Sequence, residues 1–182
     1  MKRILLFISL LILPIIAKGE IGTIPFIPEE FEIEIYQYPH MVLIENPESQ
    51  QLDTYFTFTN NEASYQIRYA FFKQTIMDDP NIKIPFLMMT LPITLNVAGY
   101  EINNFSNFDD TDVKNEFNGD FGSTIFIQNP KSDFGLGYNY ILMSFFYKNN
   151  QGFIVQSILS NDLEIFQSQN FMDIFHSFKF KN

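Results

Sequence analysis

The sequence contains no cysteine among its 182 residues. Cysteine nucleophiles, thiolate metal sites, redox-active pairs and disulfides are therefore all excluded. A lipid anchor of the bacterial lipoprotein type is excluded too, because that lipid is attached to a cysteine at the cleavage point. A fold without disulfides depends on its hydrophobic core, and a chain of this length can bury roughly 70% of its unfolded surface.

Basic residues and histidine are also scarce. The chain has 11 Lys and Arg against 21 Asp and Glu, a net charge of −10, and only two histidines, His40 and His176. Nucleic-acid binding requires a basic patch, so we expect no nucleic-acid partner. Neither histidine belongs to a recognisable Ser-His-Asp pattern, because no serine follows the G-x-S-x-G arrangement. Hydrolysis of that type is not expected.

The longest apolar run lies at the N-terminus. Met1-Lys2-Arg3 is followed by the apolar residues 4–16 and by Ala17-Lys18-Gly19, the order found in a secretory signal peptide. We predict a signal peptide over residues 1–19, cleaved near Gly19, and a periplasmic or secreted protein. The run is shorter than the roughly 20 residues that span a bilayer, and no later segment reaches that length, so we expect no membrane span after cleavage. The mature chain would carry a net charge of −13.

The rest of the chain indicates one domain. Gly22, Pro25 and Pro28 predict an extended N-terminal arm over residues 20–30. No linker, repeat or low-complexity tract follows, which predicts a single domain over residues 31–182.

Apolar and polar residues alternate in several places, as in β-strands. Residues 31–35 and 65–71 alternate as half-buried strands, and residues 41–45 and 54–59 are shorter candidates, so we expect an antiparallel meander in the first half. Residues 122–128 alternate as a further strand. Residues 138–147 and 153–159 flank Asn149-Asn150-Gln151-Gly152, which predicts a hairpin. Both of its strands carry apolar residues on both faces, so we expect it at the centre of the sheet.

Three segments are predicted to be helical. Residues 82–98 favour a kinked helix by their length, despite Pro85 and Pro92, and residues 111–118 form a short capped helix that Gly119 ends. Phe171, Ile174, Phe175 and Phe178 follow helical spacing and predict a closing helix. The elements indicate an α+β fold with a central antiparallel β-sheet of about six strands flanked by helices.

The order of these elements resembles the Mog1/PsbP-like group of domains. The resemblance covers residues 31–180 and rests on the meander, the intermediate helix, the central hairpin and the ending Phe175-His176-Ser177-Phe178-Lys179-Phe180. It implies a sandwich of an antiparallel sheet and helices that binds partners and performs no chemistry.

The acidic segment 109–120 contains the candidate binding residues. An EF-hand register that begins at Asp110 fails, because Asn115 occupies the glycine position and Phe121 the glutamate position. A capped, solvated helix is the preferred interpretation of the segment, and a non-standard cation site or a carboxylate pair for hydrolysis stays open as an alternative. The candidate residues are Asp112, Asn115, Glu116 and Asp120.

These observations predict a non-enzymatic exported binding domain whose partner is a protein or small molecule outside the cytoplasm. No pattern assigns a catalytic residue, a metal ligand or a cofactor. The alternative is an extracytoplasmic carboxylate-dependent hydrolase or metal-binding protein that uses the segment 109–120. The ligand and the oligomeric state are not encoded in any motif.

Overall fold

A computed structural model describes residues 22–23, 32–37, 40–48, 52–60, 62, 64–73, 83–98 and 103–182. The predicted signal peptide and most of the predicted arm lie outside these residues. No helix among the described residues is long and apolar enough to cross a membrane. The helices are α1 (Lys83–Ala98), α2 (Asp110–Phe117), α3 (Ser132–Gly135), the 3₁₀ helix η1 (Leu163–Gln167) and α4 (Gln169–Phe175). The strands are β1 (Gly22–Thr23), β2 (Ile33–Gln37), β3 (Met41–Ile44), β4 (Phe56–Asn60), β5 (Tyr65–Phe72), β6 (Asn103–Asn107), β7 (Phe121–Gln128), β8 (Tyr140–Lys148), β9 (Gly152–Ser160) and β10 (Phe178–Phe180).

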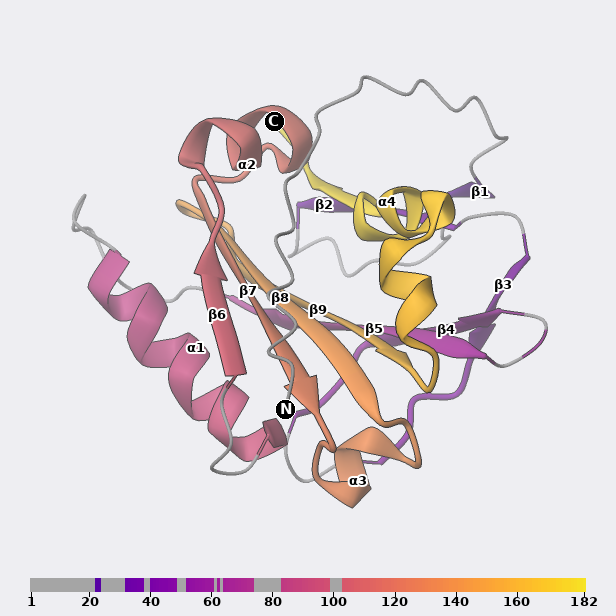
Figure 1. Cartoon of the computed structure of the whole chain (residues 1–182). Coiled ribbons are helices and arrows are strands. Elements are labelled where there is room, and N and C mark those ends of the chain that lie inside the picture. The colour runs from indigo at the N-terminus through magenta and orange to yellow at the C-terminus, as the bar shows by residue number, and fades with distance from the viewer. Residues whose placement is uncertain are drawn as a thin grey trace.

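Seven strands form one antiparallel sheet in the order β3-β4-β5-β9-β8-β7-β6, and β1, β2 and β10 form a smaller sheet (Figure 1). Side chains of α1 and α3 pack on one face of the large sheet. Side chains of α2, α4 and the small sheet pack on the other. The α+β sandwich predicted from the sequence is thereby confirmed, with seven strands in the main sheet where about six were expected.

The predicted central hairpin is formed by β8 and β9. Residues 141–147 and 152–160 are all buried, because both faces of the sheet are covered here. Its turn uses Asn150 at φ 65° and Gly152 at φ 115°, conformations that asparagine and glycine tolerate best. The expectation of a hairpin covered on both sides is confirmed.

The first half departs from the predicted meander in two respects. Only β3, β4 and β5 form it, because β2 leaves the large sheet and pairs with β10, with Ile35 opposite Phe178. In β5, residues 67–71 are buried on both faces, so the expectation of a half-buried strand is wrong. The alternation was read correctly, but α1 and α3 cover the side that carries Arg68.

The closing helix is shorter than predicted. α4 ends at Phe175, and Phe178 belongs to β10, where Phe178 and Phe180 are both buried. Gln156 of β9 explains the end of the helix, because its Nε2 donates to the carbonyls of Ile174 and Phe175 at 3.3 and 3.2 Å. Carbonyls in the last helical turn have no partner within the helix, so this buried amide satisfies them.

The other two predicted helices are confirmed with small changes. α1 runs from Lys83 to Ala98 with Pro92 inside it. α2 runs from Asp110 to Phe117 where residues 111–118 were expected, with Asp109 as its N-terminal cap, and its C-terminal cap is Asn118 at φ 56° where Gly119 was expected. Asparagine adopts this left-handed conformation more readily than most residues.

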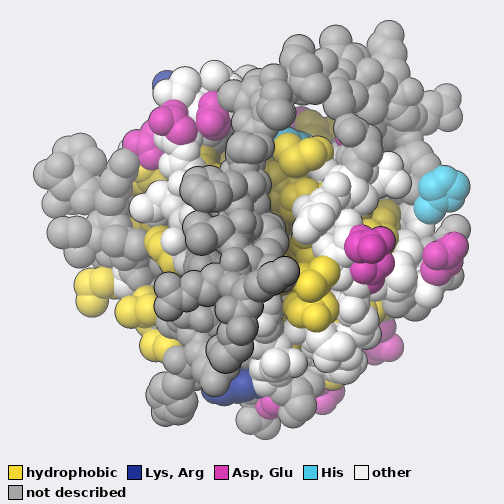
Figure 2. Space-filling view, viewed as in Figure 1, with side chains coloured by type: hydrophobic (Ala, Val, Ile, Leu, Met, Phe, Trp, Pro, Cys, Tyr) yellow, Lys and Arg dark blue, Asp and Glu magenta, His cyan; other side chains and the backbone are white. Residues whose placement is uncertain are grey.

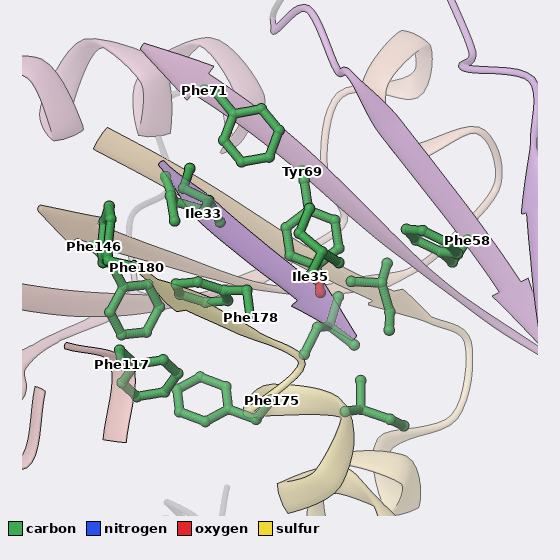
Figure 3. Packing of buried hydrophobic residues seen from close by; sticks show 14 of the residues in the cluster. Ile33, Ile35, Phe58, Tyr69, Phe71, Phe117, Phe146, Phe175, Phe178 and Phe180 are labelled. Atoms are coloured by element: carbon green, nitrogen blue, oxygen red, sulfur yellow. The ribbon is translucent and has the colours of Figure 1, made fainter. Parts of the chain in front are cut away.

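An aromatic cluster joins the face of the large sheet that carries Phe146 to α2, α4 and β10. Phe117 of α2 lies 4.3 Å from Phe146 of β8 between ring centroids, and Phe178 of β10 lies 4.9 Å from Phe146 and 5.1 Å from Phe117. Phe175 at the end of α4 completes the group (Figure 3). This cluster positions α2 against the sheet.

Candidate functional site

The acidic segment forms α2 and its two flanking turns. The carboxylate of Asp109 accepts a hydrogen bond from Thr111 N at 2.8 Å and caps the helix. Val113 and Phe117 face the sheet and are buried. Figure 2 shows Asp and Glu side chains gathered over this part of the surface. The acids in the first turn suit the positive end of the helix dipole.

The four predicted site residues do not converge. Asp112, Asn115 and Glu116 share one side of α2 by their spacing of three and four residues. Glu116 Oε2 lies 2.7 Å from His176 Nε2, and the Asn115 carbonyl accepts from Lys179 Nζ at 3.4 Å. Asp120 lies beyond the helix and belongs to a different group of residues. The structure therefore divides the predicted site into two parts.

His176 is the polar centre of the first part. Its Nδ1 lies 2.8 Å from the Met172 carbonyl and its Nε2 lies 2.7 Å from Glu116 Oε2. An oxygen atom therefore lies within hydrogen-bond distance of each ring nitrogen. The ring also stacks on Phe117 at 5.2 Å. This pair joins the end of α4 to α2, a role the sequence did not suggest.

Asp120 lies in a surface cavity of about 490 Å³, here called the α2 cavity. Asp120 Oδ2 accepts a hydrogen bond from Asn149 N at 2.7 Å, which ties the end of α2 to the β8–β9 turn. Phe121 and Tyr147 stack in parallel, with centroids 5.4 Å apart. The cavity is lined by Asp110, Thr111, Lys114, Gly119, Asp120, Phe121, Tyr147 and Asn149.

The α2 cavity is lined by charged residues of both signs, and the acidic ones outnumber the basic one. Asp110 and Asp120 contribute carboxylates and Lys114 an ammonium group. Lys148 lies close by; burial lowers the pKa of its ammonium group, while the charges of Asp120 and Glu32 act to raise it. Its Nζ donates to the Lys181 carbonyl at 2.5 Å. The cavity thus combines the aromatic residues Phe121 and Tyr147 with two carboxylates, of which that of Asp120 is held by Asn149 N.

Among the residues described, no three acidic or histidine side chains come together in a group that could hold a metal ion. None of the carboxylates described in the segment 109–120 belongs to such a group. Lys114 stands at the fifth position of that register, where an oxygen ligand would be needed.

Arg68 is a residue that the sequence analysis missed. It is 1% exposed on the α1 side of the sheet, and burial lowers the pKa of its guanidinium to about 10. Nε and Nη2 donate to Gln66 Oε1 at 3.3 and 2.8 Å, and Nη1 donates to the Phe134 carbonyl. The guanidinium carbon lies 5.1 Å from the centre of the Phe134 ring. These contacts attach α3 to β5.

The sequence signal for Arg68 was present but ambiguous. A basic residue at an alternating position of a strand ordinarily faces water. Only the helices packed on that face make the position interior.

Comparisons with known proteins identify the fold. A scan against protein-family models found no match, and neither did a search of curated proteins. Among solved structures, the solution structure of cyanobacterial PsbP (CyanoP) from Synechocystis sp. PCC 6803 is similar, with a TM-score of 0.51 and 11% sequence identity. The match covers 88% of this chain and 92% of that chain. The chain therefore has a PsbP-like fold, which confirms the resemblance stated from the sequence, and at this identity the likeness concerns the fold alone.

Proposed function

We propose that this chain is a non-enzymatic exported binding domain that uses the α2 cavity to bind an arginine-containing segment of a partner outside the cytoplasm. Export is inferred from the pattern of residues 1–19, and the absence of a catalytic role from the sequence and the resemblance. The choice of ligand is inferred from the cavity.

The observation that supports this ligand is the position of Asp110 and Asp120 beside the stacked rings of Phe121 and Tyr147. A guanidinium is planar, so it stacks on an aromatic face while its N–H groups donate to carboxylates. Phe121 is half-buried, whereas Tyr147 is fully buried. The net charge of −10 attracts a basic partner from a distance.

The two alternatives have less support. A hydrolase of the predicted kind requires a pair of carboxylates that face one space. Asp110 and Asp120 both line the α2 cavity, but Asp120 is engaged by Asn149 N, and Glu116 is paired with His176 outside the cavity. A metal site requires several oxygen ligands at one point, and the described residues contain no such group.

A titration followed by NMR amide shifts tests the proposal. The probe is a short uncharged peptide with one central arginine, compared with the same peptide carrying citrulline, which keeps the shape and removes the charge. We expect the arginine peptide to shift the amides of Gly119, Phe121 and Asn149, and to bind about tenfold more tightly than the citrulline peptide.

Asp120→Asn is the test variant, because an asparagine oxygen can still accept the hydrogen bond from Asn149 N. It should weaken arginine binding by about tenfold, whereas Glu164→Gln, an exposed acid on η1, should leave it unchanged. Equal binding of the two peptides, or equal effects of the two variants, would refute the proposed ligand.

A further inference from the structure

The two edges of the large sheet differ in their protection. β6 is polar except for Phe105, and its pairing with β7 contains a register irregularity between Asn103 and Phe105. Bulges and polar residues are devices by which proteins prevent edge strands from pairing with other chains. β3, at the opposite edge (Figure 1), consists of Met41-Val42-Leu43-Ile44 and has no charge, proline or irregularity in its pairing with β4.

In the part of the chain that the structure describes, no strand pairs with the outer side of β3. Val42 and Leu43 are each 47% exposed, and they point to opposite faces of the sheet. Among the described residues, the only side-chain bond to the backbone of this strand is from Gln37 Nε2 to the Met41 carbonyl, at 2.6 Å. The backbone of residues 42–44 has no hydrogen-bond partner in the described chain apart from β4. An apolar strand edge of this kind is a template for another strand.

We propose that β3 pairs with β3 of a second copy in an antiparallel arrangement about a two-fold axis, so that one sheet runs through both molecules. The axis passes through Val42 or through Leu43, because a two-fold axis perpendicular to an antiparallel pair places a residue opposite its own copy. Either register covers Val42 and Leu43, the two exposed apolar side chains of the edge.

Charge does not oppose a second copy at this edge. The chain carries a net charge of −10, so most contacts between copies would bring acidic side chains together. The acid nearest to β3 in the sequence is Glu45, which directly follows Ile44. In either register the two Glu45 residues lie at opposite ends of the pair, about 13 to 20 Å apart at roughly 3.3 Å per residue. That separation exceeds the Debye length of about 8 Å at physiological salt. The proposal is independent of the α2 cavity.

Sedimentation of the purified chain without residues 1–19, from 10 µM to 1 mM, measures the association. A four-residue pair is small for an interface, so we expect a dimer with a dissociation constant on the order of 0.1 mM. Leu43→Lys should abolish it, and the matched variant Ser106→Lys on the exposed β6 edge should not. A monomer at 1 mM, or a dimer that Leu43→Lys leaves intact, would overturn the proposal.

Disulfide cross-linking provides a second measurement, which does not require a lysine to be introduced into a strand. The chain has no cysteine, so a single introduced cysteine can form a disulfide only between copies. Directly opposed residues lie close enough for this bond. We expect Val42→Cys or Leu43→Cys, whichever lies on the axis, to cross-link at least tenfold faster than Ser106→Cys at 0.1 mM. Equal rates for all three variants would contradict pairing through β3.

Discussion

Gly122→Ala should destabilise this protein, although the same change in a strand ordinarily stabilises it. Gly122 lies in β7, where α2 packs against the sheet. A Cβ atom at this position would lie 2.8 Å from Phe108 Cδ2, 3.1 Å from Phe146 Cδ1 and 3.1 Å from Val113 Cγ2. Carbon atoms pack best at about 3.5 to 4.0 Å. The added methyl group therefore has no room unless α2 or the aromatic rings move.

The magnitude follows from two opposing effects. Replacing glycine by alanine within a strand gains about 0.5 to 1 kcal/mol through the lower entropy of the unfolded chain. Overpacking a filled core costs about 1 to 3 kcal/mol. Since three contacts are too short, we expect overpacking to dominate and the free energy of unfolding to fall by about 0.5 to 2 kcal/mol. The melting temperature should fall by about 1 to 8 °C.

Thermal and urea unfolding of Gly122→Ala, Phe108→Leu and the double variant measure the effect. Phe108→Leu removes the nearest ring, so the double variant should be more stable than the sum of the single effects predicts. Gly137→Ala serves as the control. Gly137 has a φ of 90° and no atom near its Cβ position, so this change strains only the backbone and should add independently to Phe108→Leu. A Gly122→Ala protein that melts at or above the parent's temperature would refute the packing argument.

Three further outcomes follow from polar contacts. Burial, followed by the hydrogen bond to Glu34 and the charge of Glu34, raises the pKa of Tyr36 to about 12. The stability that this phenol contributes below pH 10 is therefore lost as the pH rises from about 10 to 12. In an absorbance titration, Tyr36→Phe should remove a component that ionises near pH 12, and an unchanged curve would contradict this. A double-mutant cycle of Glu116→Gln and His176→Gln should give a coupling of about 0.5 to 1 kcal/mol in the free energy of unfolding, and this coupling should shrink in 1 M salt. No coupling at low salt would mean that the 2.7 Å contact between the two side chains contributes nothing to stability. Arg68→Lys keeps the charge but cannot reproduce the bonds to both Gln66 and Phe134, so urea unfolding should show a loss of about 2 kcal/mol, and an unchanged midpoint would argue against these bonds.

Local patterns were sufficient for much of the fold. The β8–β9 hairpin and α2 were predicted because turn residues, caps and alternation act over a few neighbouring positions. The cap at Asp109 and the buried pair Val113 and Phe117 follow from the same short-range rules.

Contacts between distant segments decided what local patterns left open. Phe178 fits the spacing of a helix and the alternation of a strand, and pairing with β2 made it a strand residue. Arg68 alternates like a surface residue but is buried by α1 and α3, which come later in the chain.

The candidate site shows the same division. The order of residues alone showed a cluster of acids at residues 109–120, because charge and helix caps are local properties of the sequence. Which of them share a space depended on packing: Glu116 meets His176, 60 residues away, and Asp120 meets the β8–β9 turn. Glu116 and Asp120 are four residues apart and would share one side of a continuous helix, but α2 ends at Phe117 and the chain turns at Asn118 with a φ of 56°. The tertiary structure therefore separated residues that the sequence had grouped, and it added the rings of Phe121 and Tyr147 to the α2 cavity.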